Sequence, residues 1–198
     1  MTSTGTGRGL DFLRGDIPFY TLTFAKGLPP EELLRRMGVD PDTLAPRDAV
    51  DLDDEFGDTL LDEDEPVVTA RVDGAWTWAW ERGGTHGMDE RVLAVVSRGT
   101  EAVSLYSDDK PVHRLLHAVD GEVVIGLHSL LPDGPTGSDP HRLDDRLRPL
   151  GLLPGHHAGP AVHAMLTLAE EAFGLRVTPP GDDERYWSGS LLPLPHPA

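Results

Sequence analysis

Three of the four tryptophans in this chain occupy alternate positions in one short segment, at Trp76, Trp78 and Trp80. Successive side chains of a β-strand point to opposite faces of the sheet, so this spacing predicts a strand with all three indole rings on one face. The dipeptide Asp73-Gly74 lies just before this segment and favours the two-residue turn of a β-hairpin. We therefore predict a hairpin with strands over 67–72 and 75–82.

The position of the turn determines which residues of the hairpin face each other. A loop made only of Asp73 and Gly74 places Val72 opposite Ala75, and Arg71 opposite Trp76. One face then carries small or apolar side chains, namely those of Val68, Ala70, Val72, Ala75, Thr77 and Ala79. The other face combines the tryptophans with Val67, Thr69 and Arg71, which predicts a cation–π contact between Arg71 and Trp76.

The tryptophan face has two interpretations. Large aromatic side chains dominate protein cores, so the face can be a second buried layer. Because it also carries Arg71 and Thr69, it can instead be an aromatic groove that binds a ligand or a partner. The sequence leaves both interpretations open.

The rest of the chain predicts alternating strands and helices. Turn dipeptides, helix caps and apolar spacing indicate strands over 19–24, 101–107, 112–119 and 122–128, and helices over 30–38, 90–98, 142–150 and 160–174. These elements predict an α+β fold, in which a mostly antiparallel sheet of hairpins and a meander packs with about four helices. A single domain is expected over 16–178.

Three segments are expected to lie outside the packed elements. Residues 1–15 predict a flexible N-terminus, and 179–198 predict an irregular tail rich in proline and glycine. Residues 48–65 predict an acidic connection, which can include a short helix over 49–56. Ten acidic residues and no lysine or arginine lie in this connection, and the whole chain has a net charge of −17.

Charge and composition exclude several classes of function. Phosphate binding needs a basic face, so nucleic acid is not an expected partner. The acidic surface can bind a basic protein partner. The alternative is that this surface only keeps the protein soluble. The chain has no cysteine, which excludes disulfides and thiolate chemistry. No apolar stretch is long enough for a membrane span, and 1–16 lacks a secretory signal, so we expect a cytoplasmic protein without membrane contact.

Histidines supply the few candidates for chemistry. The turn at Asp120-Gly121 places His113 opposite His128, where the two could share a metal ion. Zinc normally takes three or four protein ligands, so no metal or other cofactor is predicted. His86 lies on a glycine-rich loop after a strand, which makes it a candidate catalytic or binding residue. The alternative is a structural turn.

Several segments together resemble a known group of sequences. These are Gly74–Glu81 (Gly-Ala-Trp-Thr-Trp-Ala-Trp-Glu), the run Leu93–Tyr106, the turn Ala118–Gly121, and the opening segments Tyr20–Phe24 and Glu31–Leu34. Over about 18–173 the chain resembles an uncharacterised domain family common in Streptomyces and other actinobacteria. The resemblance implies an actinobacterial origin and an α+β fold, and it carries over no catalytic residue.

The sequence supports two hypotheses for function. The leading one is a non-catalytic, acidic, cytoplasmic interaction domain that binds a basic partner. The alternative is a ligand-binding domain or an enzyme that uses the tryptophan-lined hairpin face and the loop around His86. Its expected site residues are Arg71, Trp76, Trp78, Trp80 and His86.

Overall fold

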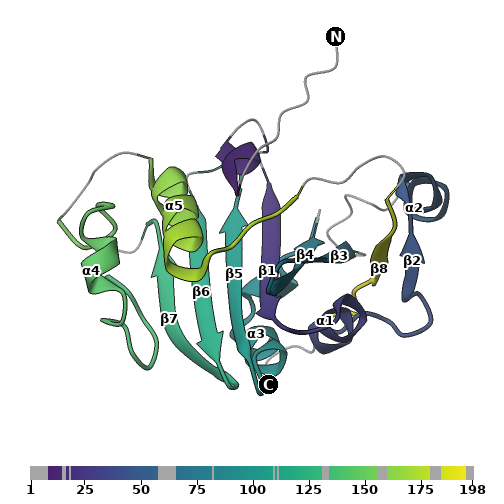
Figure 1. Ribbon diagram of the computed structural model, residues 1–198, viewed down its shortest axis with the longest axis horizontal. Helices are drawn as coiled ribbons and strands as arrows, with labels where there is room; N and C mark the ends of the chain where they lie inside the picture. The colour runs from purple at the N-terminus through teal and green to yellow at the C-terminus, as the bar shows by residue number, and fades with distance from the viewer. Residues whose placement is uncertain are drawn as a thin grey trace, which may run out of the picture.

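An eight-stranded antiparallel sheet is the framework of the computed structural model (Figure 1). The structure describes residues 9–14, 17, 19–57, 66–81, 83–108, 110, 112–130, 134–155, 160–178 and 184–194. Within these residues the strands follow the order β2-β8-β3-β4-β1-β5-β6-β7. Their bounds are β1 Tyr20–Lys26, β2 Ala45–Arg47, β3 Val67–Asp73, β4 Trp76–Glu81, β5 Glu101–Ser107, β6 His113–Val119, β7 Glu122–His128 and β8 Tyr186–Ser190. The predicted α+β fold is confirmed.

Helices cover both faces of the sheet. The described residues form α1 (Pro30–Met37), α2 (Ala49–Phe56), α3 (Glu90–Val96), α4 (Asp144–Leu147) and α5 (Ala161–Phe173), with short 3-10 turns η1 (Asp11–Arg14) and η2 (His86–Met88). α5 crosses the sheet over β6 (Figure 1). It shares one core with the tryptophans. α1 and α3 share a second core with the small residues of the opposite face. None of these helices is long and apolar enough to cross a membrane.

Local signals place both ends of α1 and the start of α3 correctly, whereas the helix expected over 142–150 spans only Asp144–Leu147. α1 begins at Pro30 and ends before Gly38, whose φ of +92° is left-handed and therefore favours glycine. The side chain of Asp89 accepts a hydrogen bond from the backbone N–H of Arg91 and caps α3, as predicted. The short helix expected over 49–56 is also present, and Asp48 caps it.

The first hairpin has a different turn from the predicted one. Its loop is Gly74-Ala75, and Asp73 pairs with Trp76, so the predicted pairing of Arg71 with Trp76 is wrong. Gly74 is the first loop residue and has a φ of +63°, as a type II′ turn requires. Each residue of β3 pairs with a β4 residue two positions further along the chain than predicted. Because side chains alternate with a period of two, the two predicted faces are unchanged.

The shifted register also changes the neighbours of Arg71. This residue pairs with Trp78, and its guanidinium lies 5.8 Å from the ring centre of Tyr186. The cation over Trp76 is the ammonium of Lys26, at 5.6 Å from the ring centre. The expected cation–π contact between Arg71 and Trp76 is therefore wrong, because the loop lies one residue further along the chain.

The second hairpin begins as predicted and then departs from the expected register. Asp120 and Gly121 both have positive φ, as a type I′ turn requires, and Val119 pairs with Glu122. A β-bulge between His117 and Ala118 then shifts the remaining pairs by one residue. His128 faces Arg114 as a result, so its predicted pairing with His113 is wrong.

Two segments expected outside the domain contribute to it. Leu10 and Leu13, in the predicted flexible N-terminus, are buried in the core beneath α5. Within the predicted irregular tail, Tyr186–Ser190 is a strand between β2 and β3. Gly189 suits this place because a Cβ there would lie 2.6 Å from Cγ1 of Val39. Residues 58–65 of the acidic connection lie outside the described part of the chain.

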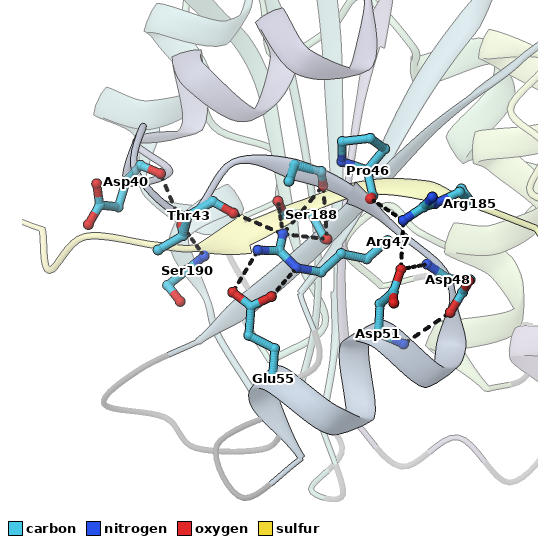
Figure 2. Close-up of polar contacts among 11 residues, drawn as sticks. Asp40, Thr43, Pro46, Arg47, Asp48, Asp51, Glu55, Arg185, Ser188 and Ser190 are labelled. Atoms are coloured by element: carbon cyan, nitrogen blue, oxygen red, sulfur yellow. Dashed lines mark hydrogen bonds and ion pairs between the residues drawn. The ribbon is translucent and has the colours of Figure 1, made fainter.

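A buried arginine joins β2, β8 and α2 (Figure 2). The Nε and Nη2 atoms of Arg47 donate to the two carboxylate oxygens of Glu55 at 2.6 and 2.7 Å. Its Nη1 donates to the carbonyl oxygens of Thr43 and Ser188 at 2.9 and 3.1 Å. Nearby, Arg185 donates to Asp51 at 2.6 Å. The acidic helix is thus attached to the edge of the sheet by two arginines.

Candidate functional site

The tryptophan face of the hairpin is a wall of the core. Trp76 and Trp78 are 5% and 1% exposed, and both pack in the cluster beneath α5. The indole Nε1 of Trp76 donates to the carbonyl oxygen of Phe173 at 3.1 Å, which fastens the end of α5. Trp80 is half-buried, with its ring 6.1 Å from that of Phe12. The described structure therefore agrees with the first interpretation of this face, a second buried layer.

Arg71 lies on the same face but is held by the C-terminal segment. Its guanidinium makes an ion pair with Glu184, with Nη2 at 3.1 Å from Oε1. The same group lies over the ring of Tyr186, the first residue of β8. These contacts give Arg71 a structural role at the junction between β3 and β8.

The sheet separates His86 from the tryptophans. Glu81 follows Trp80 in β4, so it points to the opposite face, and the loop over residues 83–88 lies against that face. The sequence expected Arg71, the three tryptophans and His86 to contribute to one site. The structure places the first four on one side of the sheet and His86 on the other, so the five cannot contact one ligand there.

Glu81 organises the loop that carries His86. Its side chain has no exposed surface, and its carboxylate accepts hydrogen bonds from two successive backbone N–H groups. His86 N lies 2.7 Å from Oε2, and Gly87 N lies 2.8 Å from Oε1. A Cβ at Gly84 would lie 2.7 Å from Oε2, so this loop can approach the carboxylate because it lacks side chains there.

Hydroxyl groups of neighbouring strands lie under the same loop. Thr21 pairs with Glu81 across β1 and β4, and its Oγ1 donates to the carbonyl oxygen of Gly84 at 2.7 Å. The hydroxyls of Thr23 and Ser104 lie 3.4 Å apart, and a Cβ at Gly87 would collide with the first of them. All three hydroxyl residues are buried, so the loop covers a polar patch on an otherwise apolar face.

Burial changes the acidity of this carboxyl group. Desolvation raises the pKa of Glu81 to about 7, although the bonds from Gly87 and His86 act in the opposite direction. Sequence reasoning missed this residue. Alternation alone could have found it, because Glu81 continues the small-residue face through Ala79 and is thus a carboxylate at an inward position.

His86 is oriented by the C-terminal segment. Its Nε2 lies 3.0 Å from the carbonyl oxygen of Leu192, and its Nδ1 lies 3.8 Å from Oε2 of Glu81. A carbonyl oxygen only accepts, so Nε2 carries the proton of this hydrogen bond. The ring is mostly buried, with 9% of the residue exposed.

A cavity of about 390 Å³ lies beside this loop. Its lining comes from the beginnings or ends of several chain segments and consists of Phe19, Pro66, Gly83, Gly84, Thr85, His86, Tyr106, Pro193 and Leu194. The rings of Phe19 and Tyr106 meet edge to face, with centres 5.7 Å apart. The antiparallel order of β1, β4 and β5 brings these residues together, because the start of β1 lies beside the ends of the other two.

The remaining histidines do not form a metal centre in the described part of the chain. No group of three or more metal-binding side chains lies together there. Nδ1 of His113 lies 3.0 Å from the hydroxyl of Ser107, whereas Nδ1 of His128 accepts from the backbone N–H of Leu130. Burial lowers the pKa of both imidazoles. The bulge at His117 removes the pairing on which the metal hypothesis depended.

Comparison with known proteins identifies a family. The model of a family of unknown function, DUF6461, matches residues 14–183. This match covers the sheet from β1 to β7 and all five α-helices, and it agrees with the expected resemblance to an uncharacterised domain. No curated protein and no solved structure matches the chain.

Proposed function

This chain belongs to the DUF6461 family, whose function is unknown, and we propose from its cavity that it binds a small ligand that combines a ring with polar groups. The cavity beside the loop at 83–88 carries this proposal. Its volume of about 390 Å³ falls within the range of small-molecule sites, and its lining presents polar surface together with aromatic and aliphatic side chains.

The lining favours a ligand that contains a ring. Phe19 and Tyr106 present aromatic surface, and Pro66, Pro193 and Leu194 add apolar contacts. Aromatic partners gain from edge-to-face or offset contacts of the kind that these two rings already make. The backbone and side chain of Thr85, which is exposed at the cavity, can bind one polar group of the ligand.

Binding of small ring compounds tests this proposal. Indole and phenol are the first probes, and a fragment library of ring compounds follows, with binding read from the NMR signals of Phe19 and Tyr106. The variant Leu194→Trp fills the cavity and should weaken binding by about tenfold or more. Leu130→Trp makes the same change at a residue that is 55% exposed and does not line the cavity, so its binding should match the wild type.

Two outcomes would refute ligand binding at this site. One is that no compound in the library shifts the signals of the two rings. The other is that Leu194→Trp and Leu130→Trp bind a probe equally well, since the probe then lies elsewhere.

A basic protein partner is the second candidate, and the outer side of α2 supports it. Asp53 and Asp54 are exposed there, whereas Asp51 and Glu55 of the same helix pair with arginines. Binding of a decalysine peptide that weakens with salt and is reduced in Asp53→Asn/Asp54→Asn would support this proposal. Equal binding by wild type and variant would refute it.

The source and cellular location are proposals as well. Resemblance of the segments around the tryptophans to actinobacterial sequences supports an actinobacterial origin. The absence of cysteine from the sequence is compatible with the reducing conditions of the cytoplasm. Detection of the native protein in cell fractions tests the location.

A further inference from the structure

The loop at 83–88 separates a buried carboxyl group from a cavity. Gly84 and His86 line the cavity on one side of the loop and contact Glu81 on the other. Glu81 itself has no exposed surface. If the loop moves away from the sheet, the same movement hydrates the carboxyl group and removes one wall of the cavity.

Ionisation of Glu81 is therefore linked to the position of the loop. Water stabilises a carboxylate far better than a buried site does, and two backbone hydrogen bonds offset only part of that difference. Burial costs a protonated carboxyl less hydration energy than it costs a carboxylate. Glu81 therefore binds a proton more tightly when the loop is closed than when it is open. Loss of this proton therefore raises the equilibrium constant for opening, by the ratio of the proton affinities of the closed and open forms.

Among the described residues of β1, β3 and β5, those nearest to Glu81 carry no charge. They are Thr21, Thr23, Val68 and Ser104. Tyr106 of β5 pairs with Thr21 on the side of β1 away from Glu81. Its hydroxyl lies 3.3 Å from Oδ2 of Asp108.

The loop and α3 supply the remaining titratable groups. The imidazole of His86 is 3.8 Å from the carboxylate, but its Nε2 is engaged by the carbonyl oxygen of Leu192. At the start of α3, Asp89 and Arg91 pair with each other, with Nη2 and Oδ2 at 2.5 Å. Glu81 is thus the carboxyl group that lies buried between the loop and the sheet in the described structure.

We propose that residues 83–88 form a proton-controlled lid, which is closed while Glu81 is protonated and opens when Glu81 ionises. Three glycines in this segment, Gly83, Gly84 and Gly87, give the backbone the freedom to move. The regulatory meaning of the lid rests on the proposed ligand site, because an open lid lacks the wall formed by Gly84 and His86. The movement of the lid itself can be measured without a ligand.

Hydrogen exchange of two backbone amides tests the lid directly. The N–H groups of His86 and Gly87 donate to Glu81, so they exchange when the lid opens. After correction for the intrinsic exchange rate, their protection should fall by up to roughly two orders of magnitude between pH 5 and pH 8.5, and the fall should level off above about pH 7. Leu93 N, which bonds to the carbonyl oxygen of Asp89 within α3, is the control amide and should keep its protection.

Matched variants separate Glu81 from other titrating groups. In Glu81→Gln the pH dependence of the two loop amides should disappear. In Glu101→Gln, which makes the same change at a half-buried carboxylate of β5, it should remain. If Glu81→Gln does not fold, a carbon-13 NMR titration of the Glu81 carboxyl in the wild type replaces it. Protection that is constant with pH, or a carboxyl that titrates below pH 5, overturns the lid.

Ligand binding distinguishes this inference from the proposed function. If the lid opens with Glu81 ionisation but no ring compound binds, the ligand site fails and the lid stands. If indole binds in the cavity while the loop amides remain equally protected at every pH, the ligand site stands and the lid fails. When both hold, binding of indole should weaken above pH 7 in the wild type and stay constant in Glu81→Gln.

Discussion

Gly84 lies directly against Glu81, so closely that a Cβ at residue 84 would be 2.7 Å from the carboxylate oxygen Oε2 and 2.8 Å from Cβ of Pro66. This contact joins the cavity wall to the buried carboxyl group. It also makes the loop at 83–88 sensitive to the addition of a single methyl group.

The substitution Gly84→Ala should destabilise the protein by about 1–3 kcal/mol, because the new methyl group meets both the carboxylate and a proline ring. Urea unfolding followed by tryptophan fluorescence measures this change. Thr85→Ala is the control at the neighbouring exposed position and should shift the free energy of unfolding by less than about 0.5 kcal/mol. Equal effects of the two substitutions would show that the loop does not press on Glu81.

The contribution of Glu81 to stability should fall as pH rises. Its folded pKa of about 7 lies above the ordinary value of 4.5, so the contribution is complete below pH 4.5 and is lost as pH rises through 7. The full change is roughly 3 kcal/mol. Urea unfolding of wild type and Glu81→Gln at pH 5 and pH 8 measures it as the difference between the two proteins.

The comparison with Glu81→Gln is needed because the histidines change the stability of the protein with pH in the opposite direction. Burial lowers the folded pKa of His113, His117 and His128, so their contributions rise with pH toward 6.5. These contributions are common to wild type and variant and cancel. An identical pH dependence in the two proteins would contradict the assignment to Glu81.

Replacement of Trp76 by alanine should cost about 3–5 kcal/mol, because the indole is buried under α5 and donates to Phe173. Thermal or urea unfolding measures the loss. Lys26→Met removes the ammonium over the ring and keeps the core, so it should cost no more than about 1 kcal/mol. A near-neutral Trp76→Ala would restore the interpretation of this face as a binding surface.

Substitution of Arg47 by leucine should cost about 3–5 kcal/mol. The change leaves the carbonyl oxygens of Thr43 and Ser188 without their shared donor in a buried place and releases Glu55. Arg47→Lys should recover only part of the loss, because lysine lacks the planar fork that binds both oxygens of Glu55.

The control for Arg47 is an exposed ion pair of the same type. Arg35 pairs with Glu31 on the surface of α1, and Arg35→Leu should change stability by less than about 1 kcal/mol. Urea midpoints of the three variants give the comparison. If Arg47→Leu and Arg35→Leu are equally mild, the attachment of β8 and α2 does not depend on the buried guanidinium.

Interactions between near neighbours in the chain were predictable from sequence. Alternation placed the three tryptophans on one face, and the prediction survived even though the turn lies at Gly74-Ala75. Helix caps such as Asp89 and Gly38 were also placed correctly, because a cap depends on the few residues around it. The turn at Asp120-Gly121 has the positive φ angles that its sequence predicts.

Interactions between distant segments were not predictable from the same signals. The bulge at His117 has no local signature, and it separated two histidines that a regular ladder would pair. Ser188, Gly189 and Ser190 are typical of a loop, yet they form a strand because β2 and β3 supply hydrogen bonds on both sides. Gly189 also allows Val39 to approach closely.

The sequence by itself determined the local elements, the α+β class and the two faces of the first hairpin. Only the tertiary structure decided that the tryptophans are core, that β8 lies inside the sheet, and that Glu81 is a buried carboxyl beside a cavity. The physical reason is the distance along the chain over which each interaction acts. Backbone geometry and capping depend on adjacent residues, whereas burial, and the pKa that follows from it, depends on which distant segments exclude water from a side chain.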